Sequence, residues 1–581
     1  MTSFNPQNPI IVQGDGSVLL EVDNAKFTEA RDLLARFAEL VKSPEYIHTY
    51  RINPLSLWNA AASGMSAAEI VDGLAGLSKY PLPSNVQRDT EEYMGRYGRL
   101  KLIWHEQKEL RLVSEDALLI TEVSRHKQLK PYIATQIDAH TLRMDAARRG
   151  HIKQALVMIG YPAEDLAGYI EGEALEIKLR PRMLHNDQPF VMRDYQRISA
   201  EAFHAGGTER GGSGVIVLPC GAGKTIVGIA AMDQLQTNTL ILTPNTVSVR
   251  QWRDELLDKT TLRDEDIGEY TGQKKQIRPI TISTYQTITY RKRGTKNKNL
   301  PIHEVHPHFG VFDERDWGLI IYDEVHLLPA PVFSITAELQ ARRRLGLTAT
   351  LVREDGLETD VFSLIGPKKY DVPWRELEKQ GWIATAIVNE VRIPLPQEIR
   401  LKYAVAERRQ QHRIAMENPE KLSILAYLLA KHAGDRVLVV GMYIKQLEEV
   451  QARYGYPLIT GKTPVKERRK LFQAFRDGEF STLIVSKVGN FAIDLPDANV
   501  MIQLSGTFGS RQEEAQRLGR ILRPKSDDTL AHFYTLVSKD TSDQEFAANR
   551  QRFLTEQGYR YNILYDDEIP DFEPIQNVME L

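Results

Sequence analysis

Two stretches of the chain, residues 189–374 and the part after Trp382, alternate short runs of Val, Ile and Leu with longer segments of helical spacing. This alternation is typical of βαβ units, which build a parallel sheet covered by helices on both faces. Strands buried on both faces read as short, continuous apolar runs. We therefore predict an α/β protein with two doubly wound parallel sheets, whose strands lie near 215–218, 239–242, 280–283, 319–322 and 345–347, and near 437–440, 483–485, 500–503 and 533–536.

A glycine-rich loop follows the first of these runs. The run at 215–218 leads into Gly221-Ala222-Gly223-Lys224-Thr225, and a helix is expected from about Ile226. Glycines let backbone N–H groups turn inward around phosphates, and a helix N-terminus adds positive potential. Lys224 would reach the β- and γ-phosphate oxygens, and the Thr225 hydroxyl would ligate Mg²⁺. A plain glycine turn is the alternative, but the strand before and the helix after it favour nucleotide binding.

A pair of carboxylates, Asp323 and Glu324, ends the apolar run at 319–322. Ligands of doubly wound sheets bind at the carboxyl ends of the strands. Asp323 can hold Mg²⁺ there through water, and Glu324 can orient and deprotonate an attacking water. A polar strand end is common when it occurs alone. Together with Lys224 upstream in the same sheet, the pair predicts ATP hydrolysis.

The second stretch contains a predicted helix with Gln516, Arg520 and Arg523. Arg520 and Arg523 are three residues apart and share one helix face. Transfer of a γ-phosphoryl group needs positive charge from outside the nucleotide's own loop, which arginine fingers supply. We predict that these residues complete the catalytic site when the two sheets face each other, so that hydrolysis changes the separation of the two domains. A solvated basic face is the alternative for this helix taken alone.

The region before residue 180 shows small helix–strand modules without a catalytic cluster. Two strands are expected around Gly14-Asp15-Gly16, followed by helices over 27–41, from Asn53-Pro54 and after Ser66, a strand pair over 100–112 and a helical stretch over 138–158. From these changes of pattern we predict four units, at 1–96, 97–180, 181–374 and 375–581.

Charge and cysteine content exclude several classes of protein. The chain has 74 Lys and Arg against 77 Asp and Glu, a net charge of −3, so a nucleic-acid surface must be a local patch. Its single cysteine, Cys220, excludes an intramolecular disulfide and a metal site built on several cysteines. No segment approaches the ~18 consecutive apolar residues of a membrane helix. We expect no membrane partner and no secretory signal.

Further motifs match one family of proteins. The chain resembles the XPB-type superfamily 2 DNA helicases almost from end to end. Arg193-Asp194-Tyr195-Gln196 is similar to the family's adenine-reading motif, and two segments, Thr243-Pro244-Asn245-Thr246 and Thr281-Ile282-Ser283-Thr284-Tyr285-Gln286, are similar to its DNA-contact motifs. Asp323-Glu324-Val325-His326 resembles the DEVH motif, Gly346-Leu347-Thr348-Ala349-Thr350 the coupling motif and Arg353-Glu354-Asp355 the RED motif. Asp494-Leu495-Pro496-Asp497-Ala498 resembles motif V, and residues 516–523 resemble motif VI. The RED motif directly after the coupling motif distinguishes this family from most other helicases.

The resemblance implies functions for individual residues. It implies nucleotide binding by Arg193, Gln196, Gly221, Gly223, Lys224 and Thr225. It implies DNA contact, or coupling of hydrolysis to movement, by Thr243, Pro244, Thr284, His326, Thr348, Thr350, Arg353, Glu354, Asp355 and Asp494. Trp252 and Tyr285 are aromatic residues that could stack on bases, or else belong to the core.

The resemblance also implies an architecture and a cellular setting. Both doubly wound domains would be RecA-like, residues 97–180 would form a damage-recognition-like module, and a thumb-like insertion over about 403–419 would grip DNA. This insertion contains Arg408, Arg409, His412 and Arg413, which have the charge for phosphate contacts. ATP and Mg²⁺ would be the cofactors. We expect a monomeric, cytoplasmic and nucleoid-associated prokaryotic protein that acts in DNA repair, with a nuclease as a partner.

Three functions fit these motifs. The first is a 3′→5′ helicase that moves on DNA and separates its strands, with single-stranded, forked or duplex DNA as its partner. The second is an ATP-driven translocase that moves on double-stranded DNA without separating its strands. The third is a DNA-binding scaffold whose ATPase only locks its conformation. Glu324, Arg520 and Arg523 argue against the scaffold, because a scaffold does not need the chemistry of turnover.

Overall fold

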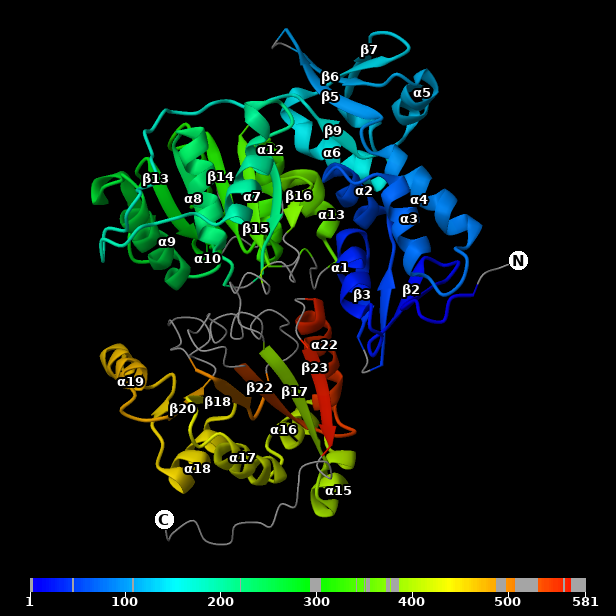
Figure 1. Cartoon of the computed structure of the whole chain (residues 1–581). Helices are drawn as coiled ribbons and strands as arrows, with labels where there is room; N and C mark the ends of the chain where they lie inside the picture. Colours follow the sequence, from blue (N-terminus) through cyan, green and yellow to red (C-terminus); the bar gives the residue numbers. More distant parts are fainter. Residues whose placement is uncertain are drawn as a thin grey trace.

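In the residues that it describes, the computed structural model of the chain contains four β-sheets, each with its own covering helices (Figure 1). It describes residues 4–43, 46–106, 109–219, 221–292, 305–340, 342–349, 351, 356–371, 377, 386–486, 498–506, 531–556 and 560–565. Within these ranges, no helix has both the length and the apolar character that a membrane crossing requires.

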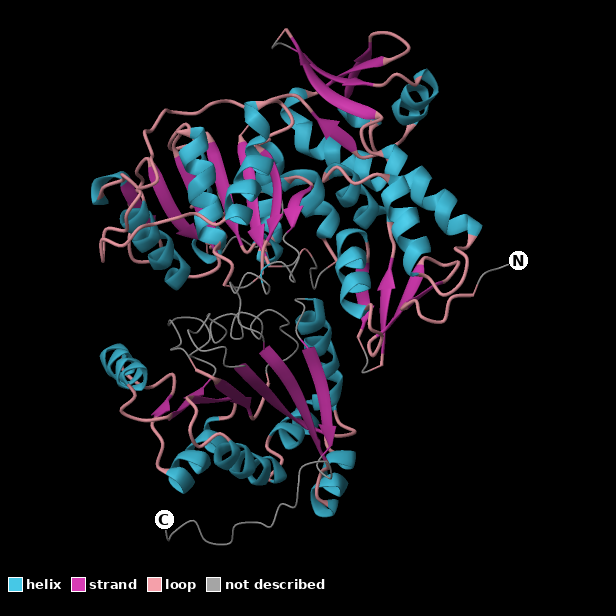
Figure 2. Cartoon of the chain, viewed as in Figure 1, coloured by secondary structure: helices cyan, strands magenta, loops and turns pink. Residues whose placement is uncertain are grey.

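The first seven-stranded sheet is parallel throughout, in the order β12-β13-β11-β14-β15-β10-β16 (Figure 2). Its strands are β10 (Ser213–Val217), β11 (Thr239–Thr243), β12 (Ile267–Tyr270), β13 (Ile280–Thr284), β14 (Leu319–Asp323), β15 (Arg343–Thr348) and β16 (Lys368–Asp371). Its helices are α7 (Asp194–His204), α8 (Lys224–Leu235), α9 (Thr246–Lys259), α10 (Tyr285–Ile288), α12 (Ala330–Glu338) and α13 (Glu358–Asp360), which continues into a π-helical turn (Val361–Ile365). The five strands predicted for this domain are confirmed.

Both faces of this sheet are buried, which explains the continuous apolar runs. Along β11, Ile241 belongs to a core cluster shared with Val249 and Leu256 of α9. Leu240 and Leu242, which point to the other face, belong to a second cluster with residues of α12. A strand with hydrophobic layers on both sides cannot show the polar alternation of a half-exposed strand.

The second seven-stranded sheet is also parallel, in the order β19-β20-β18-β21-β22-β17-β23. Its strands are β17 (Ala386–Ile393), β18 (Val437–Gly441), β19 (Leu458–Ile459), β20 (Thr482–Ser486), β21 (Val500–Gln503), β22 (Ala531–Ser538) and β23 (Arg560–Tyr565). Its helices are α15 (Gln397–Val405), α16 (Arg408–Met416), α17 (Glu420–Lys431), α18 (Ile444–Tyr454), α19 (Val465–Asp477) and α22 (Ser542–Glu556). The prediction of two doubly wound parallel sheets is therefore confirmed.

The N-terminal region forms two small sheets. A four-stranded antiparallel sheet, β1-β2-β4-β3, packs with α1 (Phe27–Phe37), α2 (Pro54–Ala62), α3 (Ala67–Leu77) and α4 (Ser84–Arg96), and its strands are β1 (Ile10–Val12), β2 (Ser17–Glu21), β3 (Glu39–Lys42) and β4 (Ile47–Arg51). A five-stranded sheet, β7-β8-β6-β5-β9, packs with α5 (Ala117–Arg125) and α6 (Arg149–Met158), and its strands are β5 (Leu100–His105), β6 (Glu109–Val113), β7 (Ile133–Gln136), β8 (Thr141–Met144) and β9 (Ala163–Asp165).

Two of the predicted helices in this region are partly wrong. The helix expected over 27–41 ends at Phe37, and Val41 belongs to β3. The helical stretch expected over 138–158 begins with β8, where Leu142 and Met144 are buried and alternate with outward-facing residues. This two-residue period pairs β8 with β6 and overrides the helical reading.

The five-stranded module docks on the first parallel sheet through buried charges. Asp165 accepts hydrogen bonds from Arg149 (Nη2 to Oδ1, 2.6 Å) and from Lys153 (Nζ to Oδ2, 3.0 Å). Lys153 also donates to Oε1 of Gln340, at the end of α12, over 2.9 Å. Next to this cluster, a side chain at Gly150 would clash with the backbone of Ala337, so α6 lies directly against α12. The two ion pairs lie within the five-stranded module, and they hold Lys153 where its hydrogen bond to Gln340 connects the two units.

Candidate ATP-hydrolysis site

The glycine loop lies between β10 and α8, and two side chains of α7 hold it. Gly221 and Gly223 have positive φ angles of 83° and 81°, which glycine adopts without strain. The Tyr195 hydroxyl and the Gln196 amide both donate to the carbonyl of Ala222, over 2.7 and 3.0 Å. A Cβ at Gly223 would lie 2.4 Å from Nε2 of Gln196, so this side chain closes over the loop. The structure thereby brings Gln196 to the loop, as predicted.

Arg193 completes the link between α7 and the loop. Its backbone N–H donates to Oε1 of Gln196 (3.0 Å), and its guanidinium donates to the Tyr195 hydroxyl (2.9 Å). Arg193 thus orients both residues that touch Ala222. Tyr195 is a site residue that the sequence reasoning did not single out, although it stands between Arg193 and Gln196 in the same motif.

Lys224 is the first residue of α8, and Thr225 is the second. The Lys224 ammonium lies 2.7 Å from Oε1 of Glu324, and both side chains are largely buried. Lys224 follows the loop after β10, and Glu324 follows β14. The strand β15 lies between β10 and β14 in the sheet. The predicted meeting of the lysine with the acidic pair is therefore present in the fold.

Glu324 turns its carboxylate back towards the loop. Its backbone is left-handed, with φ 51° and ψ 56°, a conformation that non-glycine residues seldom adopt. Its Oε2 lies 3.5 Å from Nδ1 of His326, and the same ring nitrogen lies 2.6 Å from Oγ1 of Thr348. Burial by itself raises the pKa of Glu324, but the Lys224 ammonium and His326 together hold that pKa below its usual value. The carboxylate is thus kept ionised, as a general base requires.

Asp323 is held from two sides by aromatic residues. The Trp252 indole donates to Oδ2 of Asp323 over 3.0 Å, and the Tyr285 hydroxyl donates to the backbone carbonyl of Asp323 over 2.8 Å. Both aromatic side chains are buried, so the suggestion that they stack on bases is wrong and their place in the core is confirmed. Burial and the neighbouring Glu324 carboxylate raise the pKa of Asp323 to about 6.

Three of the residues predicted to contact DNA or to couple hydrolysis to movement, Thr243, Pro244 and Thr284, lie beside this site. Thr243 and Thr284 are the last residues of β11 and β13, and they are register partners. The Thr243 hydroxyl donates to the carbonyl of Ser283 (3.1 Å), and the Thr284 hydroxyl caps α10 by accepting from the N–H of Thr287 (3.1 Å). Both threonines are buried and Pro244 is half-buried. The threonine side chains therefore hold the ends of the strands.

The donor set at this edge fits a metal–nucleotide complex. A threonine hydroxyl and a carboxylate are oxygen ligands, which Mg²⁺ prefers. Thr225 and Asp323 are the residues that would hold the ion. The ammonium of Lys224 and the N-terminus of α8 supply positive charge for phosphates in the same place.

Comparisons with known proteins agree with this geometry. Family models match residues 377–579 (ERCC3/RAD25/XPB C-terminal helicase), residues 189–353 (type III restriction enzyme, res subunit) and residues 10–138 (helicase conserved C-terminal domain). A DNA 3′-5′ helicase XPB of Kineococcus radiotolerans is 53% identical over 97% of this chain and 97% of its own length. The chain belongs to the XPB family of DNA helicases. The helicase of the same name from Mycobacterium tuberculosis is 52% identical over 97% of this chain and 98% of its own length.

A more distant XPB relative is a eukaryotic protein of Saccharomyces cerevisiae. It is named a general transcription and DNA repair factor IIH helicase/translocase subunit, and it is 32% identical over 95% of this chain and 72% of its own length. The prediction that this chain is an XPB-type helicase, and hence an ATP-using enzyme, is confirmed by these matches.

Several XPB-type site residues lie outside the described part of the chain. These are Thr350, Arg353, Glu354, Asp355, Asp494, Gln516, Arg520 and Arg523. The functions assigned to them from the sequence stay predictions.

The segment predicted as the XPB-type thumb contains α16 and the end of α15. His412 is buried, and its ring packs edge-on against Phe546 of α22. Arg413 pairs with Glu417 over 2.9 Å, whereas Arg408 and Arg409 are exposed. The expectation that His412 offers charge to phosphates is therefore wrong, because its side chain faces the core of the second domain.

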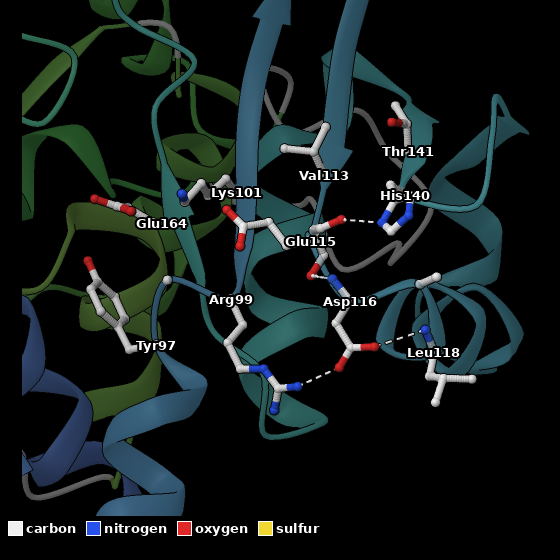
Figure 3. Close-up of a pocket in the computed structure, with 13 residues that line it drawn as sticks. Tyr97, Arg99, Lys101, Val113, Glu115, Asp116, Leu118, His140, Thr141 and Glu164 are labelled. Atoms are coloured by element: carbon white, nitrogen blue, oxygen red, sulfur yellow. Dashed lines mark hydrogen bonds and ion pairs between the residues drawn. The ribbon is translucent and has the colours of Figure 1, made fainter.

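A separate hollow of about 1320 Å³ opens on the five-stranded module (Figure 3). Arg99 and Asp116 form an ion pair on its lining, with Nη2 2.5 Å from Oδ2, and Asp116 also caps α5 by accepting from the N–H of Leu118. Lys101 on the same wall is balanced by Glu115 and Glu164, further acidic residues of the lining.

Proposed function

We propose that this chain is a 3′→5′ DNA helicase in which Lys224, Thr225, Asp323 and Glu324 carry out Mg²⁺-dependent ATP hydrolysis. The observation that carries the proposal is the 2.7 Å pair between Lys224 and Glu324 at the carboxyl edge of a parallel sheet. This pair brings a phosphate-binding cation and a candidate base to the same point. Thr225 and Asp323 supply the metal ligands.

Lys224 serves two anions in this proposal. Its ammonium neutralises Glu324 until phosphate oxygens compete for it. Once Lys224 contacts the phosphates, the Glu324 carboxylate is released from its pair and can accept a proton from water. His326 and Thr348 then sense the change, because the His326 ring lies between Glu324 and the end of β15.

Arg520 and Arg523 complete the site from the second domain in this proposal, and Gln516 lies on the same segment. Arg353, Glu354 and Asp355, with Thr350 and Asp494, convert hydrolysis into movement on DNA. The unit at 97–180 contacts damaged DNA, the thumb-like segment grips it through Arg408 and Arg409, and a nuclease that acts on the opened strands is the partner. The resemblance to prokaryotic XPB-type proteins supports these assignments.

A second candidate function is translocation on duplex DNA without strand separation. The observation that favours it is the name of the Saccharomyces cerevisiae relative, which is called a helicase/translocase subunit. Both functions use the same ATP site.

Strand separation on forked DNA tests the proposal. Forks with a single 3′ tail and forks with a single 5′ tail are incubated with ATP and Mg²⁺, and turnover is recorded in the same reactions. We expect unwinding of the 3′-tailed fork only, and no unwinding by Lys224→Ala. DNA-stimulated turnover without strand separation would favour the duplex translocase, and no turnover with any DNA would overturn both candidates.

A further inference from the structure

Three adjacent strands end together at the catalytic edge. In the order β13-β11-β14, Thr284 pairs with Thr243, and Leu242 pairs with Tyr322, the residue before Asp323. Neighbouring strands lie about 4.8 Å apart. Asp323 is therefore one strand away from Thr243 and two strands away from Thr284, the residues proposed to contact DNA.

A helix connects the end of β11 to the Asp323 side chain. Asn245 caps α9 by accepting from the N–H groups of Val247 and Ser248, so α9 begins directly after Thr243 and Pro244. Two turns later, Trp252 donates its indole N–H to Oδ2 of Asp323. A shift at the start of α9 would move this donor relative to the carboxylate.

The Trp252 ring also touches the helix of the phosphate loop. A Cβ at Gly228 of α8 would lie 2.5 Å from Cη2 of Trp252, so the ring lies directly on the α8 backbone. The indole is 1% exposed. Trp252 therefore contacts both the helix that begins with Lys224 and the carboxylate that would hold the metal.

Tyr285 makes the corresponding connection from β13. It is the first residue of α10, directly after Thr284, which caps this helix. Its hydroxyl reaches across β11 to donate to the backbone carbonyl of Asp323. Asp323 is thus held at its side chain by the segment after β11 and at its backbone by the segment after β13.

We propose that Trp252 and Tyr285 are positioning residues that transmit DNA contact at 243–246 and 284–286 to Asp323, and thereby set how strongly DNA stimulates ATP turnover. This inference rests on the proposed function, because it takes these segments to contact DNA. DNA that shifts the ends of β11 and β13 moves both donors together. Where DNA contact changes the affinity for nucleotide, nucleotide binding must change the affinity for DNA by the same factor.

A tryptophan that only filled the core would not need to donate its indole N–H to a carboxylate of the ATP site. Trp317 in the same domain is equally buried, but its indole donates to the carbonyl of Val311 within the core (2.9 Å). Trp252 instead directs its only donor to a functional carboxylate. Trp317→Phe and Tyr290→Phe are therefore matched controls, since Tyr290 is exposed and close to Tyr285 in the chain.

The test compares Trp252→Phe and Tyr285→Phe with these controls. Two quantities are measured for the full chain: the ratio of turnover with forked DNA to turnover without DNA, and the affinity for fluorescently labelled DNA with and without a non-hydrolysable ATP analogue and Mg²⁺. We expect both variants to lose about fivefold or more of the stimulation ratio and most of the nucleotide-dependent change in DNA affinity, a size typical of allosteric coupling. The controls keep both.

Outcomes for and against the inference are distinct. The inference would be overturned if both test variants were stimulated by DNA as strongly as wild type. It would also be overturned if Trp317→Phe and Tyr290→Phe lost as much stimulation as the test variants. A wild-type enzyme whose turnover DNA does not stimulate would instead count against the proposed function. If Trp252→Phe fails to fold, benzothienylalanine at position 252 keeps the shape of the ring and lacks only the N–H, so it must show the same loss of coupling.

Discussion

Lys224 and Glu324 form an ion pair in which Nζ lies 2.7 Å from Oε1. The lysine begins the helix after β10, and the glutamate directly follows β14, which is two strands away in the sheet. The pair therefore forms only when β10, β15 and β14 are assembled. The pair also offsets the cost of burying the Glu324 carboxylate, whose pKa stays below its usual value in spite of burial. Site geometry and domain folding are thus coupled.

Glu324→Gln is expected to keep ATP binding and to lose hydrolysis. The amide retains the size of the side chain but cannot accept a proton from water, and general-base catalysis contributes about 100-fold or more. Binding of a fluorescent nucleotide and turnover of ATP are measured in parallel. Glu338→Gln, on the exposed end of α12, is the control. Unchanged turnover in the Glu324 variant would remove the assignment of the base.

Arg353→Ala is expected to lower unwinding by a larger factor than it lowers DNA-free ATP turnover. The reason is that the RED motif is proposed to act in movement on DNA and not in the chemistry of hydrolysis. Unwinding of the 3′-tailed fork and turnover without DNA are the two measurements, with Arg263→Ala, a largely exposed arginine, as the control. Equal losses in both assays would leave RED without a specific function in unwinding.

Asp165→Asn is expected to weaken the contact of α6 with β9 and, through Lys153, the docking of α6 on the first parallel sheet. Arg149 and Lys153 would lose their shared buried carboxylate, and breaking a buried pair typically costs about 3–5 kcal/mol. Calorimetric unfolding of the full chain measures the loss. Asp187→Asn removes an exposed pair with Arg182 and should change stability by less than about 1 kcal/mol. Similar stabilities of the two variants would contradict the stabilising function of Asp165.

The N-terminal sheet is expected to lose stability in acid because of His48. Burial, aided by the charge of Arg31, lowers the pKa of His48 to about 4, against a usual value of 6.5. The unfolded chain therefore binds more protons between these two values, so stability present above pH 6.5 is lost as the pH falls towards 4, by up to about 3 kcal/mol. His48→Gln should flatten this dependence in unfolding measured at pH 7 and at pH 4.5. A dependence that survives the substitution would show that another group causes it.

The sequence was sufficient to predict the inner strands of both parallel sheets except β17, since burial on two faces demands continuous apolar runs. The apolar run of β17 is interrupted by Asn389, Glu390 and Arg392, and this strand was missed. The edge strands could not be found in this way. β16 has the sequence Lys-Lys-Tyr-Asp, and β12 contains a glycine and a glutamate. Edge strands have one unpaired side and less burial, so their residues carry little of the apolar signal.

The residues of the ATP site were likewise predictable only in part. Lys224, Asp323 and Glu324 were predictable because their chemistry and their positions after apolar strands point to one edge. The partners of Asp323 were not predictable in the same way. Trp252 follows Val249 and precedes Leu256 on the apolar face of a helix, which indicates burial but not the direction of the indole N–H. That direction depends on how α9 packs on α8, a tertiary contact.

The segment that follows β9 has a consequence for dissecting this protein into pieces. Leu175 donates its backbone N–H to the carbonyl of Gln236, Arg180 donates to the carbonyl of Lys259, and Ile177 is fully buried in the core of the first parallel sheet. A fragment that started at residue 181 would leave these carbonyls unpaired and an apolar groove open to solvent. A fragment that started near residue 168 would keep the segment that pairs with these carbonyls and fills the groove. We therefore expect this longer fragment to remain monomeric on its own.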